Sequence, residues 1–186
     1  LSIIDINQDL TTIGQGVLAI MLLVGGLGLM AITTFLQGFV VRGTELRCRL
    51  DRGKTLDEFG VGGVGRTFRG IALTAAVLIF FGAVILYCFG FNDISNSGER
   101  IWASIFHSIS AYNNAGFGLW SNSLQSYRTN WVVNWVIILL IILGGLGWRV
   151  TSDIWSNRRS LRIRNLSLHT RLVIRTSLIL IAIGTF

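Results

Sequence analysis

Three long uncharged stretches constrain this chain more than any other feature of its sequence. Residues 10–41, 70–92 and 129–148 run for 32, 23 and 20 residues without one Asp, Glu, Lys or Arg. About 20 consecutive apolar residues span the hydrocarbon core of a bilayer as an α-helix. A fourth apolar stretch, 177–186, runs to the last residue. The sequence therefore predicts an all-α integral membrane protein with several spans.

The composition supports the membrane interpretation and argues against an enzyme. Charged residues make up 13% of the chain, whereas soluble domains carry about a quarter. The carboxylates lie outside the uncharged stretches, and no Ser/His/Asp or Cys/His set is evident. Cys48 and Cys88 fit neither a disulfide framework nor a metal-binding spacing. No catalytic residue is predicted.

The distribution of basic residues predicts the orientation. Fourteen of the sixteen Lys and Arg residues lie in 42–69 and 149–175. Cytoplasmic loops collect Lys and Arg, so both blocks are placed inside, and the segments 1–10 and 91–128 are placed outside. The net charge of +7 is then a consequence of topology. Membrane lipids are the expected partners of these charges, and nucleic acid is not.

Residues 101–127 form a further uncharged run of 27 residues, and both of its ends are predicted to lie outside. The helix over 70–92 must exit outward, and the helix that starts at 129 must begin outside to reach the second basic block. A run that starts and ends on one face cannot cross the membrane once. The sequence therefore predicts a re-entrant segment, with a loop lying on the outer surface as the alternative.

The pattern inside this run predicts a half-helix over 99–111. Residues 95–98 offer several candidates for an N-cap. Trp102, Ile105 and Ile109 then recur at helical spacing. The half-helix also contains His107, for which a packed, neutral imidazole is favoured over a ligand.

The loop that follows, 112–119, is uncharged and rich in small residues. Non-helical backbone persists at membrane depth only where protein buries it or where it lines a watery path. Gly116 can adopt positive φ without a Cβ penalty. A half-helix that points its negative C-terminal end inward favours a cation there. The carbonyls of an extended loop can then replace the hydration shell of that cation.

A four-residue glycine motif, GGLG, occurs twice in the chain. It lies within VGGLGL at 24–29 and within LGGLGW at 143–148, 119 residues later. Each copy belongs to a helix predicted to run inward. Small residues one turn apart let helices approach closely, and recurrence at a similar topological place indicates a duplicated unit of helix, re-entrant loop and helix. The glycines predicted to pack helices are Gly25, Gly26, Gly28, Gly144, Gly145 and Gly147.

Together these motifs resemble a known family. FHSISAYNNAGF, followed by GGLGW and then LSLHTRLVIRT, is similar to the Trk/Ktr/HKT superfamily of potassium transporters, and most of all to its bacterial KtrB (NtpJ-like) membrane subunits. The resemblance implies helix–pore loop–helix units around one pore like that of potassium channels. It also implies an internal fragment that runs from just after a first filter to the first helix of a third unit. Arg149 departs from the pattern, since many relatives carry Pro there.

The resemblance also assigns a selectivity filter and a series of segments. The filter residues are Tyr112, Asn113, Asn114, Ala115, Gly116 and Phe117, and the carbonyls of Asn113, Asn114, Ala115 and Gly116 are expected to bind K+. The expected segments are an outer segment after the first pore loop (1–11), the second helix of unit 1 (12–41), a cytoplasmic basic loop (42–69), the first helix of unit 2 (70–92), the pore half-helix (99–111), the filter loop (112–119), the second helix of unit 2 (129–154), a second cytoplasmic basic loop (155–170) and the truncated first helix of unit 3 (171–186).

The function implied is K+ uptake across the plasma membrane, the inner membrane of a bacterium, by the ion-translocating subunit of a Ktr/Trk-type system. Implied partners are a cytoplasmic nucleotide-binding regulatory ring (KtrA-like) and a second copy in a homodimer, with Na+ as an activator or symported ion. No cofactor is expected on this chain, because GVGGVG at 60–65 follows no predicted strand; the nucleotide would sit on the ring. The alternatives are a secondary transporter with a re-entrant ion-binding loop, a Na+-selective member of the superfamily, and a scaffold that uses the glycines for packing alone.

Overall fold

The computed structural model describes residues 6–45, 61–156 and 166–184, and these ranges contain helices and no strand. The all-α class predicted from the sequence is thereby confirmed for the described residues. The basic residues at 46–60 and 157–165, together with Cys48, lie outside them. The elements are α1 (Ile6–Asp9), α2 (Thr12–Glu45), α3 (Val61–Ile85), a π-helical turn (Leu86–Gly90), α4 (Ser97–Tyr112), a 3₁₀ turn (Gln125–Tyr127), α5 (Trp131–Leu146), α6 (Trp148–Ser156) and α7 (Leu168–Gly184).

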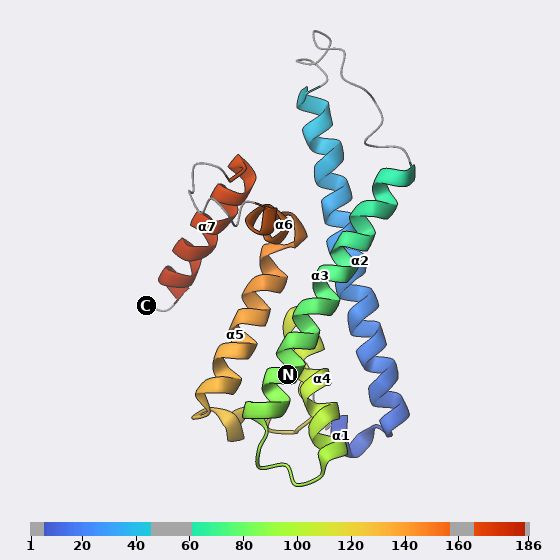
Figure 1. The fold of residues 1–186 in the computed structure, drawn as a ribbon, viewed down its shortest axis with the longest axis vertical. Helices are drawn as coiled ribbons and strands as arrows, with labels where there is room; N and C mark the ends of the chain where they lie inside the picture. Colours follow the sequence, from blue (N-terminus) through green and yellow to red (C-terminus); the bar gives the residue numbers. More distant parts are fainter. Residues whose placement is uncertain (1–5, 46–60, 157–165, 185–186) are drawn as a thin grey trace.

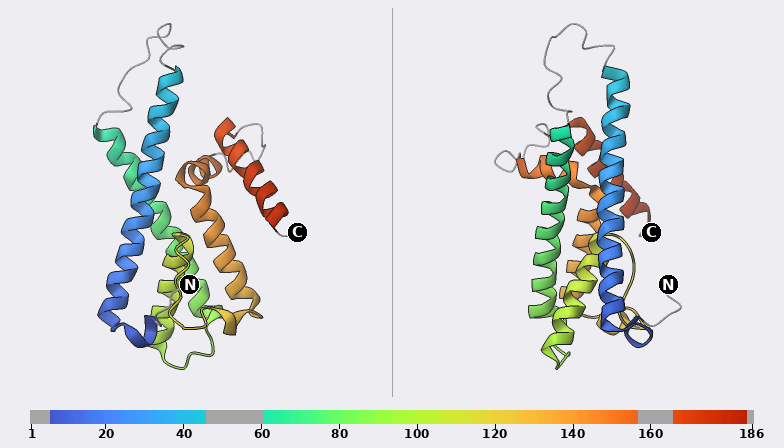
Figure 2. Two further views of the ribbon diagram at one scale, coloured as in Figure 1. Left: turned by 180° about the vertical axis from the view of Figure 1, so that it is seen from behind. Right: turned by 90° about the vertical axis from the view of Figure 1, so that its right-hand side faces the viewer.

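The helices form a bundle in which α4 is the inner element. The long helices α2 and α3 lie side by side and cross, α5 lies on the other side of α3, and α6 runs crosswise at the far end of α5 (Figure 1). The shorter α4 fills the space between α2, α3 and α5 and contacts all three (Figure 2). α7 contacts α6 and leaves much of its apolar surface exposed.

Small side chains allow α4 to be enclosed so closely. Ala103 and Ser104 are almost fully buried, as are Ser108 and Ser110 one and two turns further along the helix. On the facing side, a Cβ placed at Gly82 of α3 would lie 3.2 Å from the Ser108 hydroxyl oxygen. Helices with small residues at their contacts approach one another closely in membrane proteins. The close approach of α4 and α3 therefore depends on small residues on both helices.

A helix break interrupts the segment for which one continuous helix over 129–154 was predicted. Gly147 has φ +81° and ψ 158°, so α5 ends there and α6 begins at Trp148 in a new direction. A positive φ is accessible to glycine at little cost. The indole of Trp148 also packs on Gly70 of α3, where a Cβ would lie 2.8 Å from the ring. The helix therefore breaks at a glycine that tolerates positive φ, and the next side chain, Trp148, is held against α3.

α3 is longer than its predicted range of 70–92, because it begins at Val61, within the segment assigned to a cytoplasmic loop. At its other end the helix widens into the π-helical turn, where the Phe91 amide donates to the Leu86 carbonyl at 3.0 Å. Among the described residues, Phe68–Gly90 is the one helical stretch long and apolar enough to cross a membrane by length and composition. Two shorter apolar stretches are Thr12–Gly28, which is the first part of α2, and Trp131–Leu146, which is α5.

Candidate functional site

The N-terminal end of α4 is fixed by its cap and by an arginine. Asn96 is the N-cap, and its side-chain oxygen accepts a hydrogen bond from the Gly98 amide at 3.0 Å. The Arg100 guanidinium donates to the Tyr87 carbonyl in the π-helical turn and to the Asn92 side chain. Its central carbon also lies 4.7 Å from the centre of the Tyr87 ring. These contacts tie the start of α4 to the end of α3.

At its C-terminal end, α4 unwinds into the loop proposed from the sequence. The Asn113 amide donates to the Ile109 carbonyl at 3.1 Å, and the Ala115 amide donates to the Ser110 carbonyl at 2.9 Å. Asn114 and Gly116 then take the left-handed conformation, with φ of 54° and 72°. The positive φ anticipated at Gly116 is therefore observed. Nothing lies within 4 Å of a Cβ placed at Gly116, so the described chain constrains this residue through its backbone conformation and not through crowding.

After Gly116 the chain returns along α4 toward the end of the bundle from which α4 started (Figure 2). The Ser110 hydroxyl donates to the Phe117 carbonyl at 2.7 Å, and this bond holds the returning segment against α4. Further on, the Trp120 ring stacks on His107 with centroids 4.7 Å apart. α4 and the segment that returns along it thus begin and finish at the same end of the bundle.

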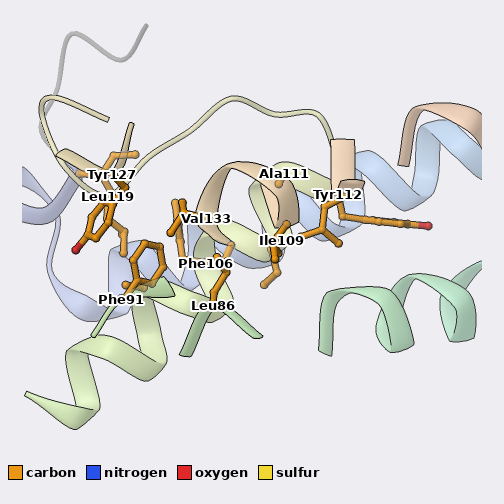
Figure 3. Packing of buried hydrophobic residues seen from close by; sticks show 14 of the residues in the cluster. Leu86, Phe91, Phe106, Ile109, Ala111, Tyr112, Leu119, Tyr127 and Val133 are labelled. Carbon is orange, nitrogen blue, oxygen red and sulfur yellow. The ribbon is translucent and has the colours of Figure 1, made fainter. Parts of the chain in front are cut away.

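The aromatic cluster around Phe91 anchors that end. Phe91 contacts Trp120 at 5.5 Å and Tyr127 at 4.9 Å between ring centroids, both in edge-to-face geometry. Burial and a hydrogen bond to Asp93 raise the pKa of Tyr127 to about 12. Phe91, Leu119 and Tyr127 lie at one end of the core, and Tyr112 lies at the opposite end (Figure 3). The base of the loop is therefore remote from the aromatic anchor.

The four carbonyls proposed as ion ligands share one property. In the described part of the chain, no hydrogen bond is made to the carbonyls of residues 113–116. The carbonyls on either side are occupied: that of Phe117 accepts from the Ser110 hydroxyl, and that of Tyr112 lies 3.5 Å from the side-chain Nδ2 of Asn114 and faces α5. Residues 114 and 116 are exposed and residues 113 and 115 are half-buried, so the loop is accessible in the described chain. Four consecutive carbonyls that are left available suit a ligand that the chain does not itself supply.

One glycine of each motif packs against the C-terminal end of α4, where the helix passes into the loop. A Cβ at Gly26 of α2 would overlap the Asn113 side-chain oxygen and lie 2.9 Å from its Cβ. A Cβ at Gly144 of α5 would overlap the Tyr112 carbonyl oxygen and lie 2.8 Å from its carbon. Gly25 and Gly28 have nothing within 4 Å of a Cβ position, and Gly145 has only an ordinary contact at 3.8 Å. Gly26 of α2 and Gly144 of α5 therefore form two sides of the place where the loop begins, which we call its seat.

His107 occupies the packed position that the sequence favoured. Its side chain is buried, and Nδ1 lies 2.8 Å from the Ala103 carbonyl oxygen. The described residues contain no group of three or more His, Cys, Asp or Glu side chains that could hold a metal ion. Sequence reasoning did not single out Ser110 and Trp120, which hold the return of the loop. A serine two residues before the loop was a visible signal, because its hydroxyl can reach the returning backbone.

The comparisons with known proteins show the family to which the chain belongs. The whole chain, residues 1–186, matches the family model described as TrkH, cation transport protein. The chain belongs to this family of cation transport proteins, which are integral to the plasma membrane, and its helices are compatible with insertion there.

Three relatives narrow the comparison. The Ktr system potassium uptake protein B of Bacillus subtilis is 34% identical over 99% of this chain, and the protein of that name from Vibrio alginolyticus is 31% identical over 100%. The potassium/sodium uptake protein NtpJ of Enterococcus hirae is 30% identical over 100%. The chain spans 40% of the length of each of these relatives. The resemblance recognised in the sequence is thereby confirmed.

Proposed function

We propose that this chain forms part of a pore for inward K+ transport and that residues 112–117 are one segment of its selectivity filter. The observation that carries the proposal is the run of four unoccupied carbonyls at residues 113–116, at the inner end of a half-helix. Carbonyl oxygens replace the hydration shell of K+ in filters of this kind. The C-terminal end of a helix adds a negative potential at the same place.

The driving force for such transport is the membrane potential. A single charge that moves down a potential of 100 mV gains about 2.3 kcal/mol. The filter must then bind K+ strongly enough to dehydrate it and weakly enough to release it. The loop that carries the available carbonyls contacts Gly144 near one end and the Ser110 hydroxyl near the other, which supports a fixed arrangement of those carbonyls.

The partners follow from the names of the relatives. Two of them are called the B protein of a Ktr system, which supports a system of several components. We extend this to a cytoplasmic nucleotide-binding ring that docks on the basic loops and to a homodimer of the membrane subunit. The relative named for potassium and sodium uptake supports a second candidate, in which the pore also carries Na+ or uses it as an activator.

The test is Gly116→Ser in a full-length transporter that carries this sequence. The φ of 72° at Gly116 is a conformation that costs residues with a Cβ about 1–3 kcal/mol. About 1.4 kcal/mol of differential binding corresponds to tenfold, so we expect the half-saturating K+ concentration to rise, or the K+/Na+ preference to fall, by about fivefold or more. Uptake of K+ or rubidium by transport-deficient cells is the measurement.

The matched control is Gly25→Ser, because Gly25 is exposed and has nothing within 4 Å of a Cβ position. Gly118 is unsuitable, since the Ser123 backbone would lie 3.3 Å from its Cβ. Both variants should reach the membrane in normal amount. Unchanged affinity and preference in Gly116→Ser would mean that the loop is only a packing element.

A further inference from the structure

One buried amide side chain joins three separate segments at the outer end of the bundle. Gln15, on the first turn of α2, is only 5% exposed. Its Oε1 accepts a hydrogen bond from the Trp102 indole of α4 at 2.7 Å, and the two residues are 87 positions apart in the sequence. Its Nε2 lies 3.3 Å from the carbonyl oxygen of Ile6 in α1 and 3.3 Å from that of Leu10.

The surroundings of Gln15 make this arrangement specific. The neighbouring residues of α2 that pack on the core are apolar, namely Leu18, Ala19 and Leu22. A buried amide among apolar side chains is costly unless its donors and acceptor are paired. Here both the oxygen and the nitrogen have partners, and these come from two different parts of the chain, α4 and the segment 6–10. Apolar packing alone tolerates sliding, whereas these bonds define one relative position.

We propose that Gln15 is a positioning residue for ion selection, because it fixes the lateral position of α4 relative to the segment 6–10 before α2. α4 has 16 residues and is therefore a rod about 24 Å long. Trp102 lies near its outer end and the loop at 113–116 follows its inner end. A tilt permitted at Trp102 therefore displaces the carbonyls that select the ion. This proposal rests on the proposed function of the loop.

The experiment is a double-mutant cycle of Gln15→Met and Trp102→Phe in the full-length transporter. Met keeps the length and loses the hydrogen bonds, and Phe removes the indole donor together with the volume of the second ring. Polar contacts between membrane helices are worth little to moderate amounts, so each single variant is expected to lower the K+/Na+ preference by about threefold to tenfold. The double variant should be no worse than Gln15→Met alone, because the bond is already absent.

The control is Gln125→Met, since Gln125 is exposed in the outer 3₁₀ turn, and it should leave preference unchanged. A role confined to stability would lower the amount in the membrane and the maximal rate while the preference stays constant, and this outcome overturns the proposal. Additive losses of preference overturn it as well. If the Gln15→Met protein does not accumulate in the membrane, the K+/Na+ preference of Trp102→Phe tests the proposal instead.

A failure of the proposed function has a different signature. In that case the unmodified protein takes up no K+, and the positioning role falls with it. The same cycle measured on thermal unfolding of the purified protein still shows a coupling between Gln15 and Trp102 that is independent of transport. The two failures are therefore distinguished by the unmodified protein alone.

Discussion

Gly26 and Gly144 lie in two copies of the same GGLG motif, and each forms one side of the seat for the loop after α4. Around this common role the two copies differ in structure. α2 continues through Gly28 to Glu45, whereas α5 ends at Leu146 and its C-cap, Gly147, has φ +81°. The next helix, α6, begins directly at Trp148. The two copies thus share a contact with the end of α4, while the last glycine is helical in the first copy and breaks the helix in the second.

The two contacts also differ in what the glycine faces. Gly26 faces the side chain of Asn113, and Gly144 faces the backbone carbonyl of Tyr112. A side chain can change rotamer, but a backbone carbonyl moves only with the chain on either side. The two copies should therefore respond unequally to the same substitution.

The largest effect is expected for Gly144→Ala. Its methyl group would overlap the Tyr112 carbonyl, and overpacking of a rigid contact costs about 1–3 kcal/mol or more. We expect a lower unfolding temperature and a loss of most K+ uptake. The neighbouring Gly145→Ala is the control, because only an ordinary contact at 3.8 Å awaits its Cβ. Equal behaviour of the two variants would contradict the seat on α5.

A smaller effect is expected for Gly26→Ala. The Asn113 side chain must move away, and its hydrogen bond to the Ile109 carbonyl at 2.9 Å is then lost, at a net cost of about 1 kcal/mol. Uptake should fall severalfold while the protein still accumulates in the membrane. Adding Asn113→Gly to Gly26→Ala should restore the unfolding temperature in part, because it removes the overlapping side chain.

No side-chain deletion can rescue Gly144→Ala in this way, since the atom it meets belongs to the backbone. Rescue at one site and its absence at the other is the sharpest contrast between the two copies. If Asn113→Gly fails to improve Gly26→Ala, the contact between α2 and the loop is not the cause of the defect.

Substitutions at the last glycine of each motif should have opposite signs. Gly147→Ala places a Cβ on a residue with φ +81° and ψ 158°, a region nearly confined to glycine, at a cost of about 1–3 kcal/mol. Gly28→Ala replaces a glycine inside a helix, with nothing within 4 Å of the new atom, and should stabilise by about 1 kcal/mol. Thermal unfolding of the two purified variants measures both shifts. Shifts of the same sign would show that the helix break does not depend on Gly147.

Much of this fold could be predicted because it depends on local sequence. The uncharged lengths predict the long helices, residues 95–98 contain the cap that Asn96 provides, and a glycine at 116 predicts positive φ. These features follow from charge, spacing and the properties of single residue types. The overlap of the sequence with a known transporter pattern added the expected filter residues, which remain a proposal.

The features that escaped prediction all depend on contacts between distant residues. The start of α3 at Val61 and the end of α5 at Gly147 are not marked by a charge or a proline. The glycine motif has the same letters whether it faces a helix or a loop, so its contact with residues 112 and 113 is visible only in three dimensions. The same holds for the bond between Gln15 and Trp102. Sequence patterns report periodicity, and they do not report which neighbour fills a given face.

The enclosure of α4 has a consequence for the order in which the protein is made. Its partners α2 and α3 precede it in the chain and α5 follows it. The buried surface of α4 carries Ser104, His107 and Ser108, which are unfavourable in contact with lipid. Because synthesis proceeds from the N-terminus, the site for α4 is incomplete until α5 has emerged and inserted. We therefore expect α4 to enter its buried position only after α5 has been made.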